Sequence, residues 1–383
     1  MIRSTLPPRR SGRSRQAPPG QSSHVAAIAC SSQARAVQAG YHGVTASGRR
    51  YAVVGGGFAG VAVAWHLLAQ ATATAPVQVQ LFDLAGLGGG GSGAAGGLLH
   101  PFSPSGKLLW RGEEAMADAL QLVQAAEHAA RADEGLDPSA QFVWRQPIMR
   151  PAATAKQVKQ FLKVQKAKAA PPAGGPAHVS CLTAREALHL LPGLSQQPVP
   201  QPAAPLARQG RGDMKAAATA AAGQPGPAAL LIKGGLVLHP VRYLRALWSA
   251  CQHQAATAGG SSATLVHERV TSLALLEQQQ GPFDAVIVAA GAAVATIPEI
   301  GDRVPLELCQ GYTLDLAWPD PAPSVQPGMA DTVPSASSSH YQASGSRGLV
   351  YHAWAGRLVA QAVLADDESM LPPELLRWKQ QPR

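Results

Sequence analysis

The hydrophobic pattern is clearest near the start of the chain, between residues 51 and 83. A short apolar run at residues 51–54 predicts a strand, glycines interrupt it, and residues 58–70 follow with the periodicity of a helix. Apolar positions alternate again from residue 77 to residue 82, which predicts a second strand ending at Asp83. The order strand, helix, strand is that of a βαβ unit and indicates a parallel sheet.

Glycines in this unit have the spacing G-x-G-x-x-G, at Gly55, Gly57 and Gly60, and Asp83 follows Gly60 by 23 residues. Gly55 permits a tight turn, Gly57 lets a pyrophosphate approach the backbone, and Gly60 lets the helix pack closely on the strand. The helix N-terminus offers N–H groups and partial positive charge to the phosphates, while Asp83 can accept from ribose hydroxyls. The run predicts a dinucleotide site, but it does not choose between NAD and FAD.

A transmembrane helix is the alternative for the same run, because residues 51–68 are uncharged and long enough to span a bilayer. Adjacent glycines argue against this interpretation, and so does the large share of glycine, alanine and threonine, which are only weakly apolar. We therefore expect no membrane span.

The remaining pattern alternates helices with strands, as in an α/β protein. Helices are predicted at residues 113–130, 154–168, 183–191, 241–251 and 349–364. Strands are predicted at residues 142–151, 230–238, 284–292 and 304–316, with two strand-like runs between residues 263 and 276. Within the stretch at residues 284–292, residues 285–290 are apolar without interruption, which is typical of a strand buried on both faces.

Local signals mark where two helices begin. Thr183 and Glu186 have the spacing of a capping box, in which each side chain bonds the other residue's backbone N–H. Pro240 stands at the first position of the following helix, where a missing N–H is tolerated. Between them, residues 196–229 are low-complexity sequence that predicts an insertion with too little apolar surface to fold.

Charge is concentrated at the N-terminus. Residues 1–50 hold eight arginines and no acidic residue, and without them the formal net charge falls from +9 to +1. The nearly neutral body therefore gives no strong nucleic-acid signal. We interpret residues 1–48 as a transit peptide or a disordered leader, since they are rich in Arg and Ser and lack an apolar signal-peptide core. The segment before Ser31 looks like a plastid processing site, so we expect a chloroplast location, with the mitochondrion as the alternative.

Cysteines and histidines give no sign of a metal site. Cys30, Cys181, Cys251 and Cys309 are far apart, and none forms a C-x-x-C pair. This spacing argues against a disulfide framework or a zinc site and suits a reducing compartment. The 12 histidines show no metal-binding arrangement either, so we expect no metal.

Several separated stretches together resemble the FAD-dependent oxidoreductases of the D-amino-acid-oxidase type, which include glycine oxidase and sarcosine oxidase. They are the nucleotide-binding run, a second glycine-rich loop at residues 91–101, the turn and helix from residue 234, the strand at residues 284–291 and the turn at residues 345–349. The chain is also similar to the flavin domain of the bacterial bifunctional enzyme that modifies a wobble uridine in tRNA.

This resemblance implies an α/β protein with a Rossmann-like FAD-binding domain and an interrupted α+β substrate domain. It implies FAD as the cofactor. The cofactor-binding residues that it implies are Gly55, Gly57, Phe58, Ala59, Gly60, Asp83, Ser92, Gly93, Gly97, Leu98, Val270, Ala290, Gly291, Gly345, Ser346, Arg347, Gly348 and Leu349.

Two residues are implied near the reacting part of the flavin. His100 follows the glycine-rich loop and could line the ring, or it could only cap the loop. Arg347 could place positive charge near the flavin, or it could only bond carbonyl groups at a helix N-terminus. No covalent attachment of the flavin can be argued from the sequence.

The predicted domains are discontinuous. Residues 49–105, 232–300 and 343–366 form the FAD-binding domain, residues 106–195 and 301–342 form the substrate domain, and residues 367–383 form a tail. The chain departs from the family pattern between Leu316 and Tyr341, where members usually have more strands, often with the residue that grips a substrate carboxylate. Here the interval is short and rich in proline and serine, so we expect a missing segment or a reduced pocket.

We therefore predict an enzyme that oxidises a C–N bond of a small amine or amino-acid-like substrate to an imine, with O₂ or another acceptor reoxidising the FAD. The alternatives are a non-catalytic flavin-binding assembly factor and an oxidase related to tRNA modification. Arg145 and Arg150 could reach a carboxylate, although solvated surface arginines are commoner. A basic helix from Lys156 to Lys168 could touch RNA phosphates, although a solvated face is the simpler interpretation. The sequence does not specify the oligomeric state.

Overall fold

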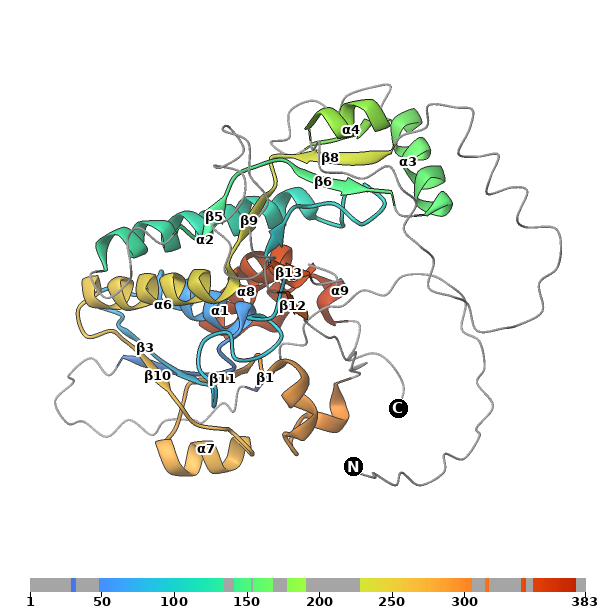
Figure 1. Cartoon of the computed structure of the whole chain (residues 1–383). Coiled ribbons are helices and arrows are strands. Elements are labelled where there is room, and N and C mark those ends of the chain that lie inside the picture. Colours follow the sequence, from blue (N-terminus) through green and yellow to red (C-terminus); the bar gives the residue numbers. More distant parts are fainter. Residues whose placement is uncertain are drawn as a thin grey trace, which may run out of the picture.

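The structure is a computed structural model that describes residues 29–31, 48–133, 141–152, 154–167, 178–190, 228–304, 314–316, 339–341 and 347–376. Its centre is a five-stranded sheet with the strand order β1-β11-β2-β3-β10 (Figure 1). The parallel strands of this sheet are β2 (Arg49–Val54), β3 (Val77–Phe82), β10 (Ser262–Val266) and β11 (Ala285–Val288). Strand β1 (Ala29–Ser31) pairs antiparallel with β11 at the edge.

Helices cover both faces of this sheet (Figure 1). On one face lie α1 (Phe58–Leu68) and α6 (Pro240–Thr257), and α2 (Gly112–Ala132) and α8 (Arg347–Ala365) pack on them. On the other face lie α7 (Leu273–Gln280) and the 3-10 turn η1 (Gly291–Thr296). Every residue of β11 is buried, which confirms the prediction of a strand covered on both faces.

Two smaller antiparallel sheets extend from this layer. The first has the order β4-β9-β5 and comprises β4 (Leu98–Leu99), β9 (Leu236–Leu238) and β5 (Val143–Trp144). The second has the order β6-β8-β7 and comprises β6 (Ile148–Pro151), β8 (Ala229–Lys233) and β7 (His178–Leu182). Strand β8 runs into β9 through Gly234 and Gly235, and β5 runs into β6 through residues 145–147, so each of these two segments contributes a strand to both sheets.

The remaining elements are short or pack on the β6-β8-β7 sheet. They are α3 (Ala155–Ala167), α4 (Ala184–Leu190), η2 (Gly301–Arg303), η3 (Glu368–Met370), α9 (Pro373–Leu376) and the paired strands β12 (Leu314–Leu316) and β13 (Ser339–Tyr341). The predicted capping box of α4 is confirmed, since Thr183 N donates to Glu186 at 2.8 Å and Glu186 N donates to Thr183 at 3.3 Å. Pro240 begins α6, as predicted.

One strand prediction is wrong. The second strand-like run between residues 263 and 276 contains the start of α7, because residues outside the run favour a helix there. The Ser272 side chain accepts from Leu275 N at 3.3 Å, and Glu299 accepts from both the Ser272 hydroxyl and Ala274 N. These bonds satisfy N–H groups that the first turn of a helix leaves without partners. Glu299 is distant in sequence, so the local pattern could not reveal this cap.

Some parts of the predicted domains lie within the described residues, and other parts lie outside them. Within the predicted leader, Ala29–Ser31 form an edge strand, while the rest of residues 1–47 lie outside the described residues. Most of the predicted insertion and residues 317–338 also lie outside them. Helix α2, which we assigned to the substrate domain, packs against α6 and α8. Among the described residues, no helix is both long enough and apolar enough to cross a membrane.

Candidate functional site

The first glycines lie where β2 passes into α1, at the carboxyl end of the parallel strands. Gly55 has a φ of +117°, and a Cβ there would lie 2.4 Å from the carbonyl oxygen of Ala289, at the end of β11. A Cβ on Gly60 would lie 1.9 Å from the carbonyl oxygen of Gly55. The turn therefore contacts both the neighbouring strand and the helix backbone to backbone, which only glycine allows.

Gly57 faces the second glycine-rich loop. A Cβ on Gly57 would lie 2.7 Å from the Ser92 hydroxyl oxygen, which accepts a hydrogen bond of 3.1 Å from Phe58 N. Because Ser92 uses an oxygen lone pair in this bond, its hydroxyl proton remains able to donate. That proton and the N–H groups of the first turn of α1, which includes Ala59, suit an anionic oxygen such as that of a phosphate.

Asp83 follows β3 and organises the same turn. One carboxylate oxygen accepts from Gly56 N at 2.8 Å and the other accepts from Ala85 N at 2.9 Å. A carboxylate oxygen has more than one lone pair, so these bonds still leave acceptors for ribose hydroxyls. Asp83 thus has a structural role that the spacing alone did not show.

The second glycine-rich loop is held between the first turn and β9. Gly88 N donates to Gly56 O at 3.0 Å, and a Cβ on Gly93 would lie 1.9 Å from Gly88 O. Gly97 has a φ of +68°, and its Cβ would lie 1.8 Å from Leu238 O. We call the first turn of α1, Asp83 and the loop around Ser92 the cradle. The contacts of Gly88, Gly93 and Gly97 lead the chain from the cradle into β4, where Leu98 pairs with Val237 of β9.

The other predicted cofactor residues are more dispersed. Ala290 and Gly291 follow β11, and the Ala290 Cα would lie 3.1 Å from a Cβ on Gly55. Val270 packs, partly buried, on the α7 side of the sheet. Gly348 is exposed and Leu349 is buried in the first turn of α8. Gly345 and Ser346 lie outside the described residues, as does the side chain of Arg347, the first residue of α8.

A buried polar pair that the sequence did not indicate fixes the start of α8. Tyr243 of α6 donates to His352 Nε2 at 2.7 Å, and His352 Nδ1 donates to the carbonyl oxygen of Leu349 at 2.6 Å. Burial lowers the pKa of His352 to about 4, so its ring is neutral and holds a single proton, on Nδ1. The Phe58 ring at the start of α1 lies 5.6 Å from the His352 ring, between centroids. The first turns of α1 and α8 are therefore held together.

His100 lies at the end of β4 and is 2% exposed. Burial, reinforced by the positive charge of Arg150, lowers the pKa of its imidazole to about 4, so the ring is neutral near pH 7. Phe102 N lies 3.3 Å from Nδ1, and Arg150 Nη2 lies 3.4 Å from Nε2. A Cβ on Gly235 would lie 3.2 Å from the His100 Cβ, so this glycine leaves room for the histidine.

Arg145 and Arg150 have different surroundings. Arg145 is exposed and makes a two-point ion pair with Glu127 of α2, with N–O distances of 2.7 and 2.6 Å. Arg150 is half-buried, and besides His100 it contacts only the carbonyl oxygen of Ser103, at 3.2 Å, among its described polar partners. Burial lowers the pKa of Arg150. The sequence held a signal for this difference, since Arg150 shares a strand face with the buried Ile148.

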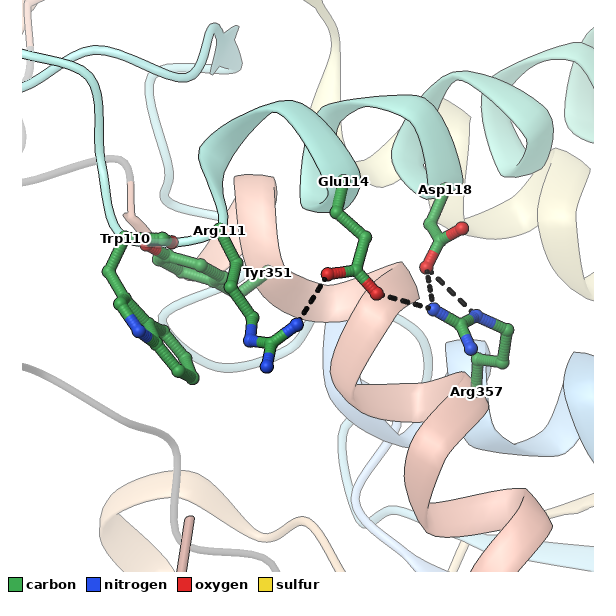
Figure 2. Close-up of polar contacts among 6 residues, drawn as sticks. All are labelled: Trp110, Arg111, Glu114, Asp118, Tyr351 and Arg357. Carbon is green, nitrogen blue, oxygen red and sulfur yellow. Dashed lines mark hydrogen bonds and ion pairs between the residues drawn. The ribbon is translucent and has the colours of Figure 1, made fainter. Parts of the chain in front are cut away.

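A cluster of ion pairs joins the start of α2 to α8 (Figure 2). Arg357 contacts Asp118 at 2.9 Å and Glu114 at 3.3 Å, and Glu114 also accepts from Arg111 at 3.0 Å. The Arg111 guanidinium lies 5.3 Å from the centre of the Trp110 ring. Each arginine of this cluster, which we call the α2–α8 clamp, has a carboxylate partner. Within the described part of the chain, no three His, Cys, Asp or Glu residues are grouped to hold a metal.

Comparisons with known proteins agree with this arrangement. The family model described as FAD dependent oxidoreductase (DAO) matches residues 50–359. No curated protein sequence matches the chain. Among solved structures, glycine oxidase from Geobacillus kaustophilus is 21% identical, with a TM-score of 0.43, over 69% of this chain and 60% of that one.

Two further solved structures are similar to the chain over different shares of their lengths. Iminodiacetate oxidase from Chelativorans sp. BNC1 is 17% identical, with a TM-score of 0.46, over 85% of this chain and 98% of that one. L-Amino acid deaminase from Proteus myxofaciens is 14% identical, with a TM-score of 0.37, over 75% of this chain and 55% of that one. The chain therefore spans less than two thirds of the glycine oxidase and of the deaminase.

The cradle fits the cofactor of this family. Gly57 has no side chain between the α1 N-terminus and the Ser92 hydroxyl, so donors from both segments can reach a pyrophosphate. The predicted α/β fold with a Rossmann-like FAD-binding part is confirmed, and so is the predicted cofactor, FAD. The chain belongs to the family of FAD dependent oxidoreductases.

Proposed function

We propose that the chain oxidises a C–N bond of an amine or amino-acid-like substrate. The observation that carries this proposal is the convergence of segments that the family resemblance assigns to FAD. The first turn of α1, the stretch from Ser92 to β4 and the start of α8 are far apart in sequence, yet each contacts at least one of the others. They meet at the carboxyl end of the parallel strands, where α/β sheets bind ligands.

When bound, FAD would accept a hydride from the carbon next to the substrate nitrogen, which leaves an imine for water to hydrolyse. The chain supplies binding and orientation. Gly57 and Ser92 would hold the pyrophosphate, and Asp83 would accept from the ribose. Strand β4 leads from this cradle to His100, whose neutral ring would line the flavin. We expect Arg347, at the start of α8, to place positive charge near the flavin.

The first test is whether the purified full-length chain binds FAD, and whether it loses FAD when a side chain is introduced at Gly57. Flavin absorbance should accompany the protein, and Gly57→Leu should lose it because the side chain would meet Ser92. Gly90→Ala is the matched control, since a Cβ there would have nothing within 4 Å. Retention of FAD by Gly57→Leu would show that the pyrophosphate lies elsewhere.

The second test is reduction of the bound flavin. Anaerobic mixing with glycine, sarcosine and other amines should bleach the flavin absorbance with at least one of them. If none does, the chain would instead be a non-catalytic flavin-binding factor. Bleaching only by a modified uridine nucleoside carrying an amine would support the alternative related to tRNA modification.

We also propose that residues 1–48 direct the protein to the chloroplast. Their arginine-rich, acid-free composition supports this proposal. A fusion of these residues to a fluorescent protein should accumulate in plastids. Accumulation in mitochondria would favour the alternative, and a diffuse signal would indicate a leader without an address.

A further inference from the structure

A chain of buried hydrogen bonds runs from α6 into the first turn of α8. Tyr243 of α6 donates to His352 Nε2 at 2.7 Å, and His352 Nδ1 donates to Leu349 O at 2.6 Å. Because a carbonyl oxygen can only accept, the single proton of this neutral ring lies on Nδ1, and Nε2 takes its bond from the tyrosine hydroxyl. Only this order of donors and acceptors satisfies both ring nitrogens.

The polar groups of this chain lie in the apolar core. Tyr243 is 0% exposed and His352 is 3% exposed, and the side chains packed around the tyrosine belong to the main hydrophobic cluster. Two apolar side chains would fill the same space without needing any hydrogen bond, so packing alone does not explain the pair. A fully bonded polar pair in a core specifies one arrangement of the elements that carry it. The pair therefore specifies where α8 begins relative to α6.

The same pair contacts the start of α1. The Phe58 ring lies 5.6 Å from the His352 ring and 6.1 Å from the Tyr243 ring, between centroids. The backbone N–H of Phe58 donates to the Ser92 hydroxyl, within the cradle. A displacement of the His352 ring would therefore move a residue of the cradle as well as the first turn of α8.

Other contacts hold the middle of α8 against α1. A Cβ on Gly356 would lie 2.9 Å from the Ala62 Cβ, so the two helices approach closely there. Burial lowers the pKa of His66 to about 4, and the neutral ring donates from Nε2 to Ala353 O at 3.1 Å. These contacts set the distance between the helix axes, whereas the bond from His352 acts on a carbonyl oxygen of the first turn itself.

We propose that Tyr243 and His352 are positioning residues for FAD, which hold the first turn of α8 in a fixed place beside the cradle. This inference rests on the proposed function, which assigns the start of α8 to the flavin. The N–H groups of a helix N-terminus carry partial positive charge, which stabilises the added negative charge of a reduced flavin. If the first turn loses its bond to Tyr243 through His352, the chain should bind FAD less tightly and the flavin should be harder to reduce.

Tyr243→Phe tests this in the full-length flavoprotein, because it removes one hydroxyl and keeps the ring. The Kd for FAD should rise about 3- to 10-fold, the range of one hydrogen bond. In a titration with dithionite beside a reference dye, the ratio of reduced to oxidised flavin at a given potential should fall about two- to fivefold. Tyr351→Phe is the matched control and should leave both values unchanged, since its exposed hydroxyl donates to Trp110 O, where water can replace it.

A double variant separates positioning from folding. Tyr243→Phe alone leaves His352 Nε2 without a donor, so it lowers stability as well. Tyr243→Phe combined with His352→Leu removes both polar groups, and urea unfolding should show much of this stability restored. Both flavin values should nevertheless stay shifted, because Leu349 O has lost its side-chain donor in this variant.

A native Kd and native flavin reduction in Tyr243→Phe would overturn the inference, and so would recovery of both values in the double variant. If Tyr243→Phe does not fold, the double variant alone decides. Dithionite reduces the flavin without any substrate, so a native chain that binds FAD but is reduced by no amine would refute only the proposed oxidation. A native chain that holds no FAD would refute both.

Discussion

Arg357 of the α2–α8 clamp and Arg150 of β6 are both partly buried, but their partners differ. Arg357 is held between two carboxylates, those of Glu114 and Asp118 (Figure 2). Arg150 is held between a carbonyl oxygen and a neutral imidazole. The first guanidinium is neutralised by its own chain and fixes one helix against another. The second has no carboxylate partner within the described part of the chain.

Among the tests of this comparison, the largest expected effect is a loss of folding stability at acidic pH. Burial lowers the pKa of His66, His100 and His352 to about 4 each, against 6.5 when unfolded. The unfolded chain therefore binds more protons at these rings, so their contribution to stability is full above pH 6.5, is lost between pH 6.5 and 4, and changes no further below. Each histidine should contribute about 3 kcal/mol to this loss. In the α2–α8 clamp, the lowered pKa of Glu114 adds a loss only near and below its ordinary value of 4.5, so the loss at higher pH reports on the buried rings, including the one beside Arg150.

Urea unfolding at pH 7 and pH 4.5 measures this loss. His100→Gln should reduce the difference between the two pH values, because one buried ring no longer titrates. His128→Gln, on the exposed face of α2, is the control for losing a histidine. An unchanged difference in His100→Gln would show that its imidazole does not stay neutral in the folded protein.

Removing the clamp arginine should have the next largest effect on stability. Arg357→Met leaves Asp118, whose side chain is only 13% exposed, without its cation. We expect a loss of about 1–2 kcal/mol, as for charged hydrogen bonds near the surface. Asp118→Asn combined with Arg357→Met should cost less than the sum of the two single changes. Full additivity in this double-mutant cycle would show that the pair does not hold α2 on α8.

Removing Arg150 should change stability much less. Among the described residues, Arg150→Met leaves no carboxylate unpaired, and it removes a guanidinium that burial has desolvated, so the free energy of unfolding should stay within about 1 kcal/mol. Thermal unfolding of Arg150→Met beside Arg357→Met gives the direct contrast. A loss larger than that of Arg357→Met would mean that Arg150 is structural and would break the comparison.

The smallest effect is expected at Arg111. This residue has a φ of 48°, one of two positive values among the described residues other than glycine. Arg111→Asn keeps a side chain that tolerates this conformation but loses the exposed ion pair with Glu114. The free energy of unfolding should fall by about 0.5 kcal/mol. A loss above about 2 kcal/mol would give Arg111 a larger part in the clamp than its exposure suggests.

Local patterns predicted most of the central sheet and its helices. The strand at β2, the helix α1 and the buried strand β11 follow from periodicity, because burial on one or both faces imposes a repeat on the sequence. The prediction failed at α7, where the cap depends on Glu299, beyond the helix. It also did not foresee β1, whose pairing with β11 has no signature in three residues.

The candidate site also contains residues that the sequence predicted and residues that it did not. Gly55, Gly57 and Gly60 could be found from spacing, because a tight turn and a close backbone contact restrict three nearby positions to glycine. Tyr243 and His352 are 109 residues apart, so no local pattern could pair them. The alternation of β6 indicated that Arg150, on the same face as Ile148, is less exposed than Arg145, but only the neighbours in space show a surface ion pair at Arg145 and no carboxylate contact at Arg150 among the described residues.

By itself, the sequence determined a nucleotide-binding βαβ unit and an N-terminal region with concentrated positive charge, and it predicted the order of the FAD-binding segments. These features depend on residues close together in the chain, so their spacing records them. Only the tertiary structure decided that Ser92 meets the start of α1, that α8 is bonded to α6, and that Arg150 lies against His100. Hydrogen-bond balance and charge compensation depend on neighbours in space, and folding brings those neighbours together from distant parts of the chain.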